Sequence, residues 1–390
     1  MAAFLFFCVC ALHALSLSAA GHDQSHNGDP CGDVKQYLSP IAIPGLHVIC
    51  VKQEMCDVEG GMRLTVWEKA RSRQSSVVDV VVHMNASRHL QVHQVVKALE
   101  SKLRIKKKGK GYNEPALYRC SDGVKMQRRD AFADYGTSAF CFYEGGVFIW
   151  PPGVIGSMRF AVHGDGQRFA MRTLSISPIV FEVQNFIKQE ECEHIKTLAL
   201  PQMQSSPVKL IDADKGKDAT EWRTSSQAHL LLDNDDMLLG LTRRVETVSK
   251  LPASHARGIQ VLKYEKMQHY ASHYDFFDPE LYKKQPEIIK FIKNGARNRF
   301  VTVFFYLSDV EKGGHTNFPL ADGGWGSTPP DYFDCSRGLS VKPERGKVIL
   351  FYNMHANGEL DKSSLHGGCD VLEGTKLSAN YWLYSQKFDP

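Results

Sequence analysis

The sequence predicts an α+β protein in which a mainly β domain, residues 169–390, follows a small α+β domain, residues 21–168. Short apolar runs rich in β-branched and aromatic residues recur in the second half of the chain, which is typical of strands. Turn clusters such as Gly313-Gly314 and Gly367-Gly368 separate these runs. Many strands after a helical lead-in predict a β-sandwich or jelly roll with buttressing helices.

The composition is that of a globular protein, with 43% hydrophobic and 23% charged residues. A formal net charge of +4 over 390 residues is slight. It gives no reason to expect nucleic acid as a partner.

Residues 1–20 contain no charged side chain and end in the small residues Ser18, Ala19 and Ala20. This pattern predicts a secretory signal peptide, although a basic residue near the start is missing. An uncleaved N-terminal anchor is the alternative, and a membrane is a partner only in that case. Both interpretations send the remaining chain into the secretory pathway.

The small domain is expected to contain a hairpin, a helix and two further strands. Residues 62–67 and 77–83 read as the hairpin, 93–105 as an amphipathic helix, and 117–118 and 140–148 as strands. This ββαββ order fits a ubiquitin-like β-grasp module of unknown role. Lys106, Lys107, Lys108 and Lys110 then form a basic run, interpreted as a solvated helix end, with contact to an acidic partner as the alternative.

The large domain begins with an expected strand over residues 178–187. Residues 189–200 follow, where Cys192, Ile195 and Leu198 recur at helical spacing. Further strands are expected over residues 259–264, 300–307, 348–352 and 378–384.

Eight cysteines follow the leader, an even number that suggests disulfides in an oxidising lumen without fixing their pairing. No C-x-x-C pair indicates a zinc site. Asn85 begins a glycosylation sequon, which supports the same compartment weakly.

The central chemical signal is His273-Tyr274-Asp275 together with the distant His366. Iron that must activate oxygen needs few protein ligands and open positions, and two histidines and one carboxylate on one face meet that need. Residues two apart on an extended segment point the same way, so His273 and Asp275 can reach one metal. His163-Gly164-Asp165 has the same spacing but lies between glycine-rich turns, and we interpret it as a surface turn.

Tyr264 and Lys376 extend this signal, since each lies on or beside a predicted strand at a fixed distance from a histidine. A bound dicarboxylate needs a buried cation and a hydroxyl donor for its remote carboxylate. Lys376 and Tyr264, with Thr316, supply those groups. Lys376 taken alone would more often be a surface lysine.

Residues 171–390 resemble the catalytic domain of prolyl 4-hydroxylases, closest to the single-chain plant and algal forms. The matching stretches, which follow one another in the family order, are Glu190-Glu191-Cys192-Glu193-His194-Ile195, Trp222-Arg223-Thr224-Ser225-Ser226, Tyr264 with His273-Tyr274-Asp275, 299–308, 313–319, 335–343, 364–369 and 374–382.

The resemblance implies a double-stranded β-helix core and several site roles. It implies iron ligands His273, Asp275 and His366, and 2-oxoglutarate contacts from Lys376, Tyr264 and Thr316. The peptide groove implied by the resemblance is lined by Arg223, Ser225, Tyr270, Arg299 and Trp382. Core packing explains Tyr270 and Trp382 equally well when each is taken singly.

The resemblance also makes Cys335 and Cys369 disulfide partners, with two separate thiols or other pairings as the alternative. The chain departs from the family at His315, where an acidic residue is usual, and at Tyr384, where a histidine is common. These departures predict a different groove shape. The loop Asp212-Ala213-Asp214-Lys215-Gly216 fails as a calcium site, because Arg223 occupies the position of the required glutamate.

The function expected is Fe(II)- and 2-oxoglutarate-dependent hydroxylation of proline at C4 in proline-rich proteins, with O2 as co-substrate and L-ascorbate as the reductant that the family uses. The alternatives are an oxygenase of the same fold acting on another residue or a small molecule, and a non-catalytic peptide-binding protein. The compartment expected is the lumen of the endoplasmic reticulum or Golgi. The sequence leaves the hydroxylated protein and the oligomeric state open.

Overall fold

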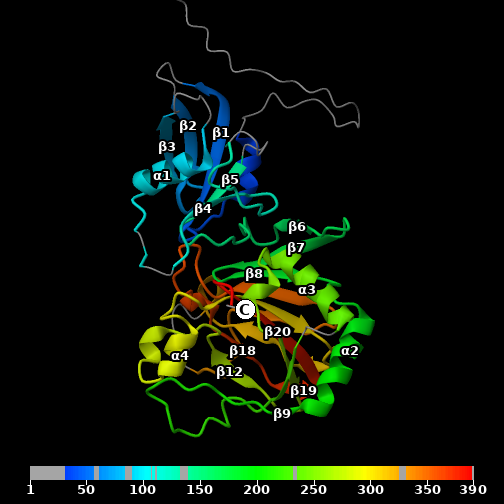
Figure 1. Cartoon of the computed structure of the whole chain (residues 1–390). Helices are drawn as coiled ribbons and strands as arrows, with labels where there is room; N and C mark the ends of the chain where they lie inside the picture. Colours follow the sequence, from blue (N-terminus) through cyan, green and yellow to red (C-terminus); the bar gives the residue numbers. More distant parts are fainter. Residues whose placement is uncertain are drawn as a thin grey trace, which may run out of the picture.

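The computed structural model describes residues 31–56, 61–83, 90–106, 108–109, 112–131, 139–231, 235–324 and 331–388. Figure 1 shows a small module, in blue and cyan, beside a larger domain coloured from green to red. The predicted signal peptide, residues 1–20, and the sequon at Asn85 lie outside the described residues. Among the helices of the described part of the chain, none is long and apolar enough to cross a membrane.

The N-terminal module is a five-stranded sheet covered by one helix. Its strands lie in the order β3-β2-β1-β5-β4. The elements are β1 (Leu46–Cys56), β2 (Gly61–Trp67), β3 (Val77–His83), α1 (Val92–Lys102), β4 (Ala116–Arg119) and β5 (Ala139–Tyr143). Buried Val92, Val95, Val96 and Leu99 of α1 pack with residues of the sheet such as Leu64. The predicted hairpin β2–β3 and the predicted helix are confirmed.

The β-grasp interpretation of this module is wrong in one respect. A further strand, β1, precedes the hairpin and occupies the centre of the sheet, where it pairs with β2 and β5. Every pairing in the sheet is antiparallel, whereas a ubiquitin-like β-grasp joins two central strands in parallel. The mixed polar and apolar sequence of β1 hid it from the sequence analysis.

The large domain contains two facing sheets, as a jelly roll requires. The larger one has the strand order β6-β7-β8-β17-β13-β20-β11-β10-β9, and the smaller one has the order β12-β18-β15-β16. The strands of the larger sheet are β6 (Met158–Val162), β7 (Arg168–Ile176), β8 (Ile179–Val183), β9 (Gln204–Ser205), β10 (Ser226–Leu230), β11 (Ile259–Tyr264), β13 (Arg299–Tyr306), β17 (Val348–Tyr352) and β20 (Lys376–Tyr384). Those of the smaller sheet are β12 (Tyr270–His273), β15 (Thr316–Phe318), β16 (Leu339–Val341) and β18 (His366–Gly368).

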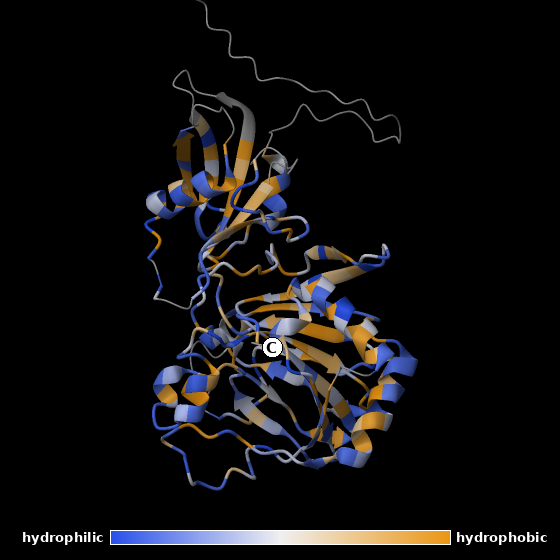
Figure 2. Ribbon diagram, viewed as in Figure 1, coloured by the Kyte–Doolittle hydropathy of each residue, from blue (hydrophilic) through white to orange (hydrophobic). Residues whose placement is uncertain are grey.

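The remaining elements lie around these two sheets. They are the helices α2 (Gln189–Ala199), α3 (Asp236–Ser249) and α4 (Pro286–Phe291), and the short pair β14 (Lys312–Gly313) and β19 (Val371–Glu373). Figure 2 shows the middle strands of the larger sheet as hydrophobic, with α2 and α3 carrying both colours. This pattern is expected of helices that cover one side of a sheet with their apolar faces. Buried Leu238, Leu241, Val245 and Val248 of α3 belong to the main hydrophobic core.

The segment between the two bodies is packed firmly against the large domain. Trp150 is fully buried, and its indole Nε1 donates a hydrogen bond of 2.7 Å to the carbonyl of Val248. Its backbone N–H donates to the hydroxyl of Tyr352 at 3.1 Å. Strand β6 follows and pairs with β7, so the larger sheet begins at Met158, ahead of the predicted boundary between residues 168 and 169.

Candidate active site

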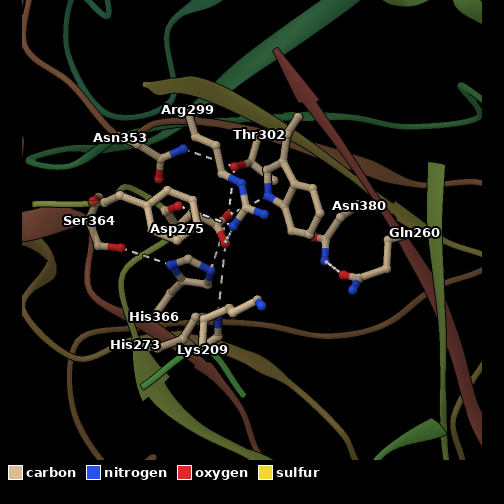
Figure 3. Close-up of polar contacts among 12 residues, drawn as sticks. Lys209, Gln260, His273, Asp275, Arg299, Thr302, Asn353, Ser364, His366 and Asn380 are labelled. Atoms are coloured by element: carbon tan, nitrogen blue, oxygen red, sulfur yellow. Dashed lines mark hydrogen bonds and ion pairs between the residues drawn. The ribbon is translucent and has the colours of Figure 1, made fainter. Parts of the chain in front are cut away.

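His273, Asp275 and His366 come together in the structure between the two sheets. One possible ligand atom from each of the three lies within 4.8 Å of the others. His273 ends β12 and His366 begins β18, and the two histidines face each other as register partners in that antiparallel pair. Figure 3 shows the two imidazoles and the carboxylate directed toward one another.

Backbone carbonyls fix the orientation of both imidazole rings. Nδ1 of His273 lies 2.9 Å from the carbonyl of Ala271, and Nδ1 of His366 lies 2.8 Å from the carbonyl of Ser364. A carbonyl accepts only, so each Nδ1 carries the proton and each Nε2 presents a lone pair toward Asp275. The Nε2 atoms of His273 and His366 lie 3.9 Å and 3.7 Å from the Asp275 carboxylate.

The environment keeps His273 and Asp275 in the protonation states that a metal needs. Burial, reinforced by the neighbouring His366, lowers the pKa of His273 to about 3. Burial alone would raise the pKa of Asp275, but His366, Arg299 and His273 outweigh it and lower that pKa. Neutral imidazole and ionised carboxylate are the ligating forms.

One oxygen of Asp275 is held by its protein neighbours. Thr302 on β13 donates to Oδ2 at 2.7 Å, and the indole Nε1 of Trp382 donates to the same atom at 3.0 Å. Asn353 in turn donates to the Thr302 hydroxyl at 2.9 Å (Figure 3). The other oxygen, Oδ1, lies 3.9 Å from Nε2 of His273 and 3.7 Å from the Arg299 guanidinium. A metal ligand supported in this way is held in place before the ion arrives.

Lys376 is a buried cation on the strand next to Tyr264. The two residues are register partners on β20 and β11, and the Lys376 side chain is only 2% exposed. Its ammonium lies 5.4 to 5.9 Å from the ring centroids of Tyr264, Phe304 and Tyr306. In the described part of the chain it has no carboxylate partner. Burial lowers its pKa to about 7.

Thr316 lies between the strand that carries His366 and Tyr306, one of the rings around Lys376. It is buried on β15 and pairs with Gly368, two residues after His366 on β18. Its hydroxyl accepts a hydrogen bond of 2.8 Å from Tyr306. A side chain at Gly368 would meet the hydroxyl of Tyr264 at 3.8 Å. The strand that carries His366 therefore runs between Thr316 and Tyr264.

The residues expected to line the groove form two stacked pairs around the histidines. Arg223 lies over the ring of Tyr270 at 4.5 Å, and Tyr270 stacks on His273 with ring centroids 3.6 Å apart. Arg223 also donates to the hydroxyl of Ser225 at 3.1 Å. On the other side of Asp275, the Arg299 guanidinium stacks on Trp382 at 3.5 Å.

The two departures from the family pattern lie near these groups. The Tyr384 hydroxyl accepts from Nε of Arg299 at 3.4 Å, so it belongs to the second stacked pair. His315 precedes Thr316, and its carbonyl accepts from the N–H of Cys369 at 2.9 Å.

The predicted disulfide Cys335–Cys369 is present, with its Cα atoms 6.2 Å apart. It joins the end of β18 to the segment before β16, so it ties together the strands on both sides of Thr316. Cys31–Cys50 and Cys120–Cys141 form two further disulfides in the N-terminal module, and Cys192 is buried and free.

Two motifs set aside in the sequence analysis do lie outside the site. His163-Gly164-Asp165 forms the turn between β6 and β7, as expected. Asp212 lies in a loop, where it accepts from the backbone N–H of Lys284 and from the Gln285 side chain.

Thr302, Asn353 and Tyr306 were missed in the sequence analysis. Each is buried on or directly after a strand, where its residue type also occurs for packing. The signal that would have found Thr302 is strand alternation, since it shares a face of β13 with Phe304 and Tyr306, which neighbour Lys376.

The donor set fits a ferrous ion. Two neutral imidazoles and one carboxylate form a facial set that leaves positions open for a co-substrate and O2. The unpaired ammonium of Lys376 fits an additional anion in the same domain. A core of facing antiparallel sheets with this site defines the class of Fe(II)- and 2-oxoglutarate-dependent oxygenases.

Comparison with known proteins agrees with that class. The family model of the 2OG-Fe(II) oxygenase superfamily matches residues 259–384. Probable prolyl 4-hydroxylase 3 of Arabidopsis thaliana is 40% identical over 214 residues, which cover 54% of this chain and 71% of that protein. Prolyl 4-hydroxylase 5 of the same plant is 36% identical over 228 residues, covering 58% and 74%. The chain belongs to the prolyl 4-hydroxylase family.

Among solved structures, a viral collagen prolyl hydroxylase from Paramecium Bursaria Chlorella virus-1, in complex with 2-oxoglutarate, is similar. It has 21% sequence identity and a TM-score of 0.37, and the match covers 53% of this chain and 95% of that chain.

Proposed function

We propose that the chain hydroxylates proline residues of proline-rich proteins at C4, using Fe(II), 2-oxoglutarate and O2. The observation that carries the proposal is the convergence of His273, Asp275 and His366 in a domain whose buried Lys376 has no acidic partner among the described residues. Membership of the prolyl 4-hydroxylase family selects proline as the residue that is modified.

His273 and His366, each through Nε2, and the carboxylate of Asp275 would hold the iron. Iron bound there supplies oxygen activation coupled to the oxidative decarboxylation of 2-oxoglutarate to succinate and CO2. Thr302 and Trp382 keep Oδ2 of Asp275 engaged, so that one carboxylate oxygen remains for the metal. L-ascorbate is the reductant expected to rescue turnovers in which 2-oxoglutarate is consumed but no proline is hydroxylated.

Lys376 binds the remote carboxylate of 2-oxoglutarate, with the hydroxyls of Thr316 and Tyr264 as further donors. The cation is desolvated, so its attraction for a carboxylate is stronger than it would be at the surface. The apolar rings around it exclude water from the co-substrate. Phe304 and Tyr306 form part of that lining.

The stacked pairs Arg223–Tyr270 and Arg299–Trp382 present flat surfaces on either side of the metal ligands. A proline-rich segment in polyproline II conformation docks well against such walls, because it loses little entropy on binding. We assign these four residues and Ser225 to the peptide groove. They hold the C4 position of one proline toward the open face of the metal.

The compartment we propose is the lumen of the endoplasmic reticulum or Golgi. Three disulfides support it, because such bonds persist in oxidising compartments.

The test is incubation of purified protein with proline-rich peptides, Fe(II), 2-oxoglutarate and ascorbate. We expect a mass gain of one oxygen, located at C4 of proline, together with equimolar succinate. Asp275→Ala is the inactive control. Succinate without any modified peptide would favour an oxygenase with another substrate, and absence of both products would favour a non-catalytic binding protein.

A further inference from the structure

Strand β6 presents apolar side chains to solvent at the edge of the larger sheet, where the Arg168 guanidinium of β7 lies over the Phe160 ring at 4.7 Å. Met158, Phe160 and Val162 alternate along this strand and are 40%, 45% and 55% exposed. Arg159 and Ala161 point to the other face and are buried. Soluble strands normally show the reverse arrangement, with the polar residues outside. Figure 1 shows the β6–β7 hairpin between the small module and the larger domain, at the edge of the larger sheet.

The backbone of this strand is open on one side. In the described part of the chain β6 pairs with β7 and with no other strand. Thr173 donates to the carbonyl of Ser157, and His163 donates to that of Gln167, so the odd-numbered residues of β6 bond to β7. Antiparallel strands alternate in this respect. Phe160 and Val162 therefore direct their N–H and C=O groups toward the free edge.

Arg159 does not protect this edge. An inward-pointing charge is one device that keeps edge strands from pairing. Here the Arg159 guanidinium is engaged, since it donates to the carbonyl of Pro151 at 2.8 Å and also to that of Gln36. It also lies over the ring of Tyr37 at 5.5 Å. These contacts hold the guanidinium on the buried face, away from an approaching strand.

We propose that β6 is a homodimer interface, in which the β6 edges of two copies pair antiparallel about a two-fold axis at Phe160. The sequence is self-complementary in this register. Phe160 meets Phe160 of the other copy, and Met158 meets Val162, so every exposed apolar side chain has an apolar partner. Moving the axis by one residue would place Val162 opposite Gly156, or Met158 opposite Gly164, and would lose that match.

The size of the contact sets the expected affinity. Pairing of two short strands with their outward side chains buries on the order of 1,000 Å² in total, the lower limit for a specific interface. A reversible dimer with a dissociation constant in the micromolar range is therefore expected. This inference does not depend on the proposed hydroxylase activity, because β6 is remote in the sheet order from the strands that carry the metal ligands.

The test is sedimentation velocity of the full chain, produced in a secretory host, over a range of concentrations. We expect a monomer–dimer equilibrium. Phe160→Lys places two like charges on the axis and should raise the dissociation constant at least tenfold. Leu231→Lys, a replacement at a side chain that is 75% exposed on another part of the domain, should leave it unchanged. A Tm within a few degrees of the parent protein shows that each variant is folded.

The pairing register of the two β6 strands can be tested separately. Phe160→Cys should be joined into covalent dimers by a short thiol-to-thiol reagent. Val162→Cys should not, because the two copies of residue 162 lie about 14 Å apart along the paired strands. A protein that is monomeric at every concentration overturns the proposal, as does an unchanged equilibrium in Phe160→Lys. Protected amides at Phe160 and Val162 in such a monomer would mean that another part of the same chain covers the edge.

Discussion

The hydroxyl of Thr302 donates a 2.7 Å hydrogen bond to Oδ2 of Asp275, the carboxylate oxygen that the Trp382 indole also contacts. Asp275 therefore has one oxygen hydrogen-bonded to the protein, while the other, Oδ1, lies 3.7 Å from the Arg299 guanidinium and can turn to a metal. The two donors come from β13 and β20, neighbouring strands of the larger sheet, while the histidines come from the smaller sheet. The site depends on both sheets keeping their spacing.

Thr302→Val should weaken Fe(II) binding by about 10- to 100-fold, which is typical for loss of a hydrogen bond to a metal ligand. The replacement keeps the shape of the side chain but removes the donor to Asp275 and leaves the Asn353 amide without its acceptor. The apparent Fe(II) constant measured from succinate formation is the readout. Thr302→Ser keeps the hydroxyl and should behave like the parent. Equal iron affinity in Thr302→Val would show that the hydrogen bond does not support the ligand.

Lys376→Met should raise the dissociation constant for 2-oxoglutarate by at least 100-fold. Methionine fills a similar volume among the rings of Tyr264, Phe304 and Tyr306 but carries no charge for the remote carboxylate. Calorimetric titration of the Mn(II)-loaded protein measures this constant. Metal affinity without co-substrate should stay near the parent value, and a loss of metal binding instead would place Lys376 in a structural role.

Binding of 2-oxoglutarate should weaken as the pH rises above about 7. Burial lowers the pKa of Lys376 to about 7 in the free protein. The charged form therefore prevails below that pH, and the neutral form above it must take up a proton when the dicarboxylate binds. Titrations at pH 8.5 in buffers of different ionisation enthalpy should report proton uptake, and at pH 6 they should not. The effect should disappear in Lys376→Met.

Arg299→Gln should raise KM for a proline-rich peptide at least tenfold while KM for 2-oxoglutarate changes little. The guanidinium lies over Trp382 at 3.5 Å and over Phe277 at 5.2 Å, so its plane is part of the proposed groove wall. Glutamine loses both the charge and most of this flat surface. Arg257→Gln is the matched control, because Arg257 also stacks on aromatic rings but lies on the exposed surface. A parallel change in both KM values would argue for a damaged metal site.

Removal of the Cys335–Cys369 disulfide by paired alanine substitutions should lower stability by about 4 kcal/mol in the chain-entropy account of a 34-residue separation. It should also weaken 2-oxoglutarate binding, because the bond ties together the strands on both sides of Thr316. The control is the Cys31–Cys50 pair, with a separation of 19 residues. Its removal should cost about 3 kcal/mol and leave co-substrate affinity unchanged. Chemical denaturation and calorimetry provide the two measurements.

The convergence of the proposed metal ligands was predictable because the spacing of two of them has a geometric meaning. His273 and Asp275 are two apart on an extended segment, and this alternation places both side chains on one face. Strand alternation places Thr302 on the same face as Phe304 and Tyr306, but its role was missed because a threonine among valine and phenylalanine reads as an ordinary strand residue. Its role exists only because Asp275 approaches it from a different part of the chain.

Strands β6 and β1 were missed in the prediction for another physical reason. In β6 the apolar residues face outward, so the usual reading of alternation does not identify which side is the core. In β1 the pattern mixes polar and apolar residues, although Leu46 and Val48 are fully buried. Whether such a segment forms a strand, and which of its faces is buried, depends on the neighbouring strands. The local sequence does not contain that information.

The burial of Trp150 bears on where the chain can be cut. A fragment that keeps residues 169–390 would retain the stretch that resembles the plant relatives, yet it would lose the indole that bonds to Val248 and the N–H that bonds to Tyr352. Such a fragment would expose Tyr352, which is buried in the intact chain, together with apolar residues of α3. The part of the chain that folds as a unit is therefore longer than residues 169–390, and minimal versions of this enzyme should begin upstream of residue 150.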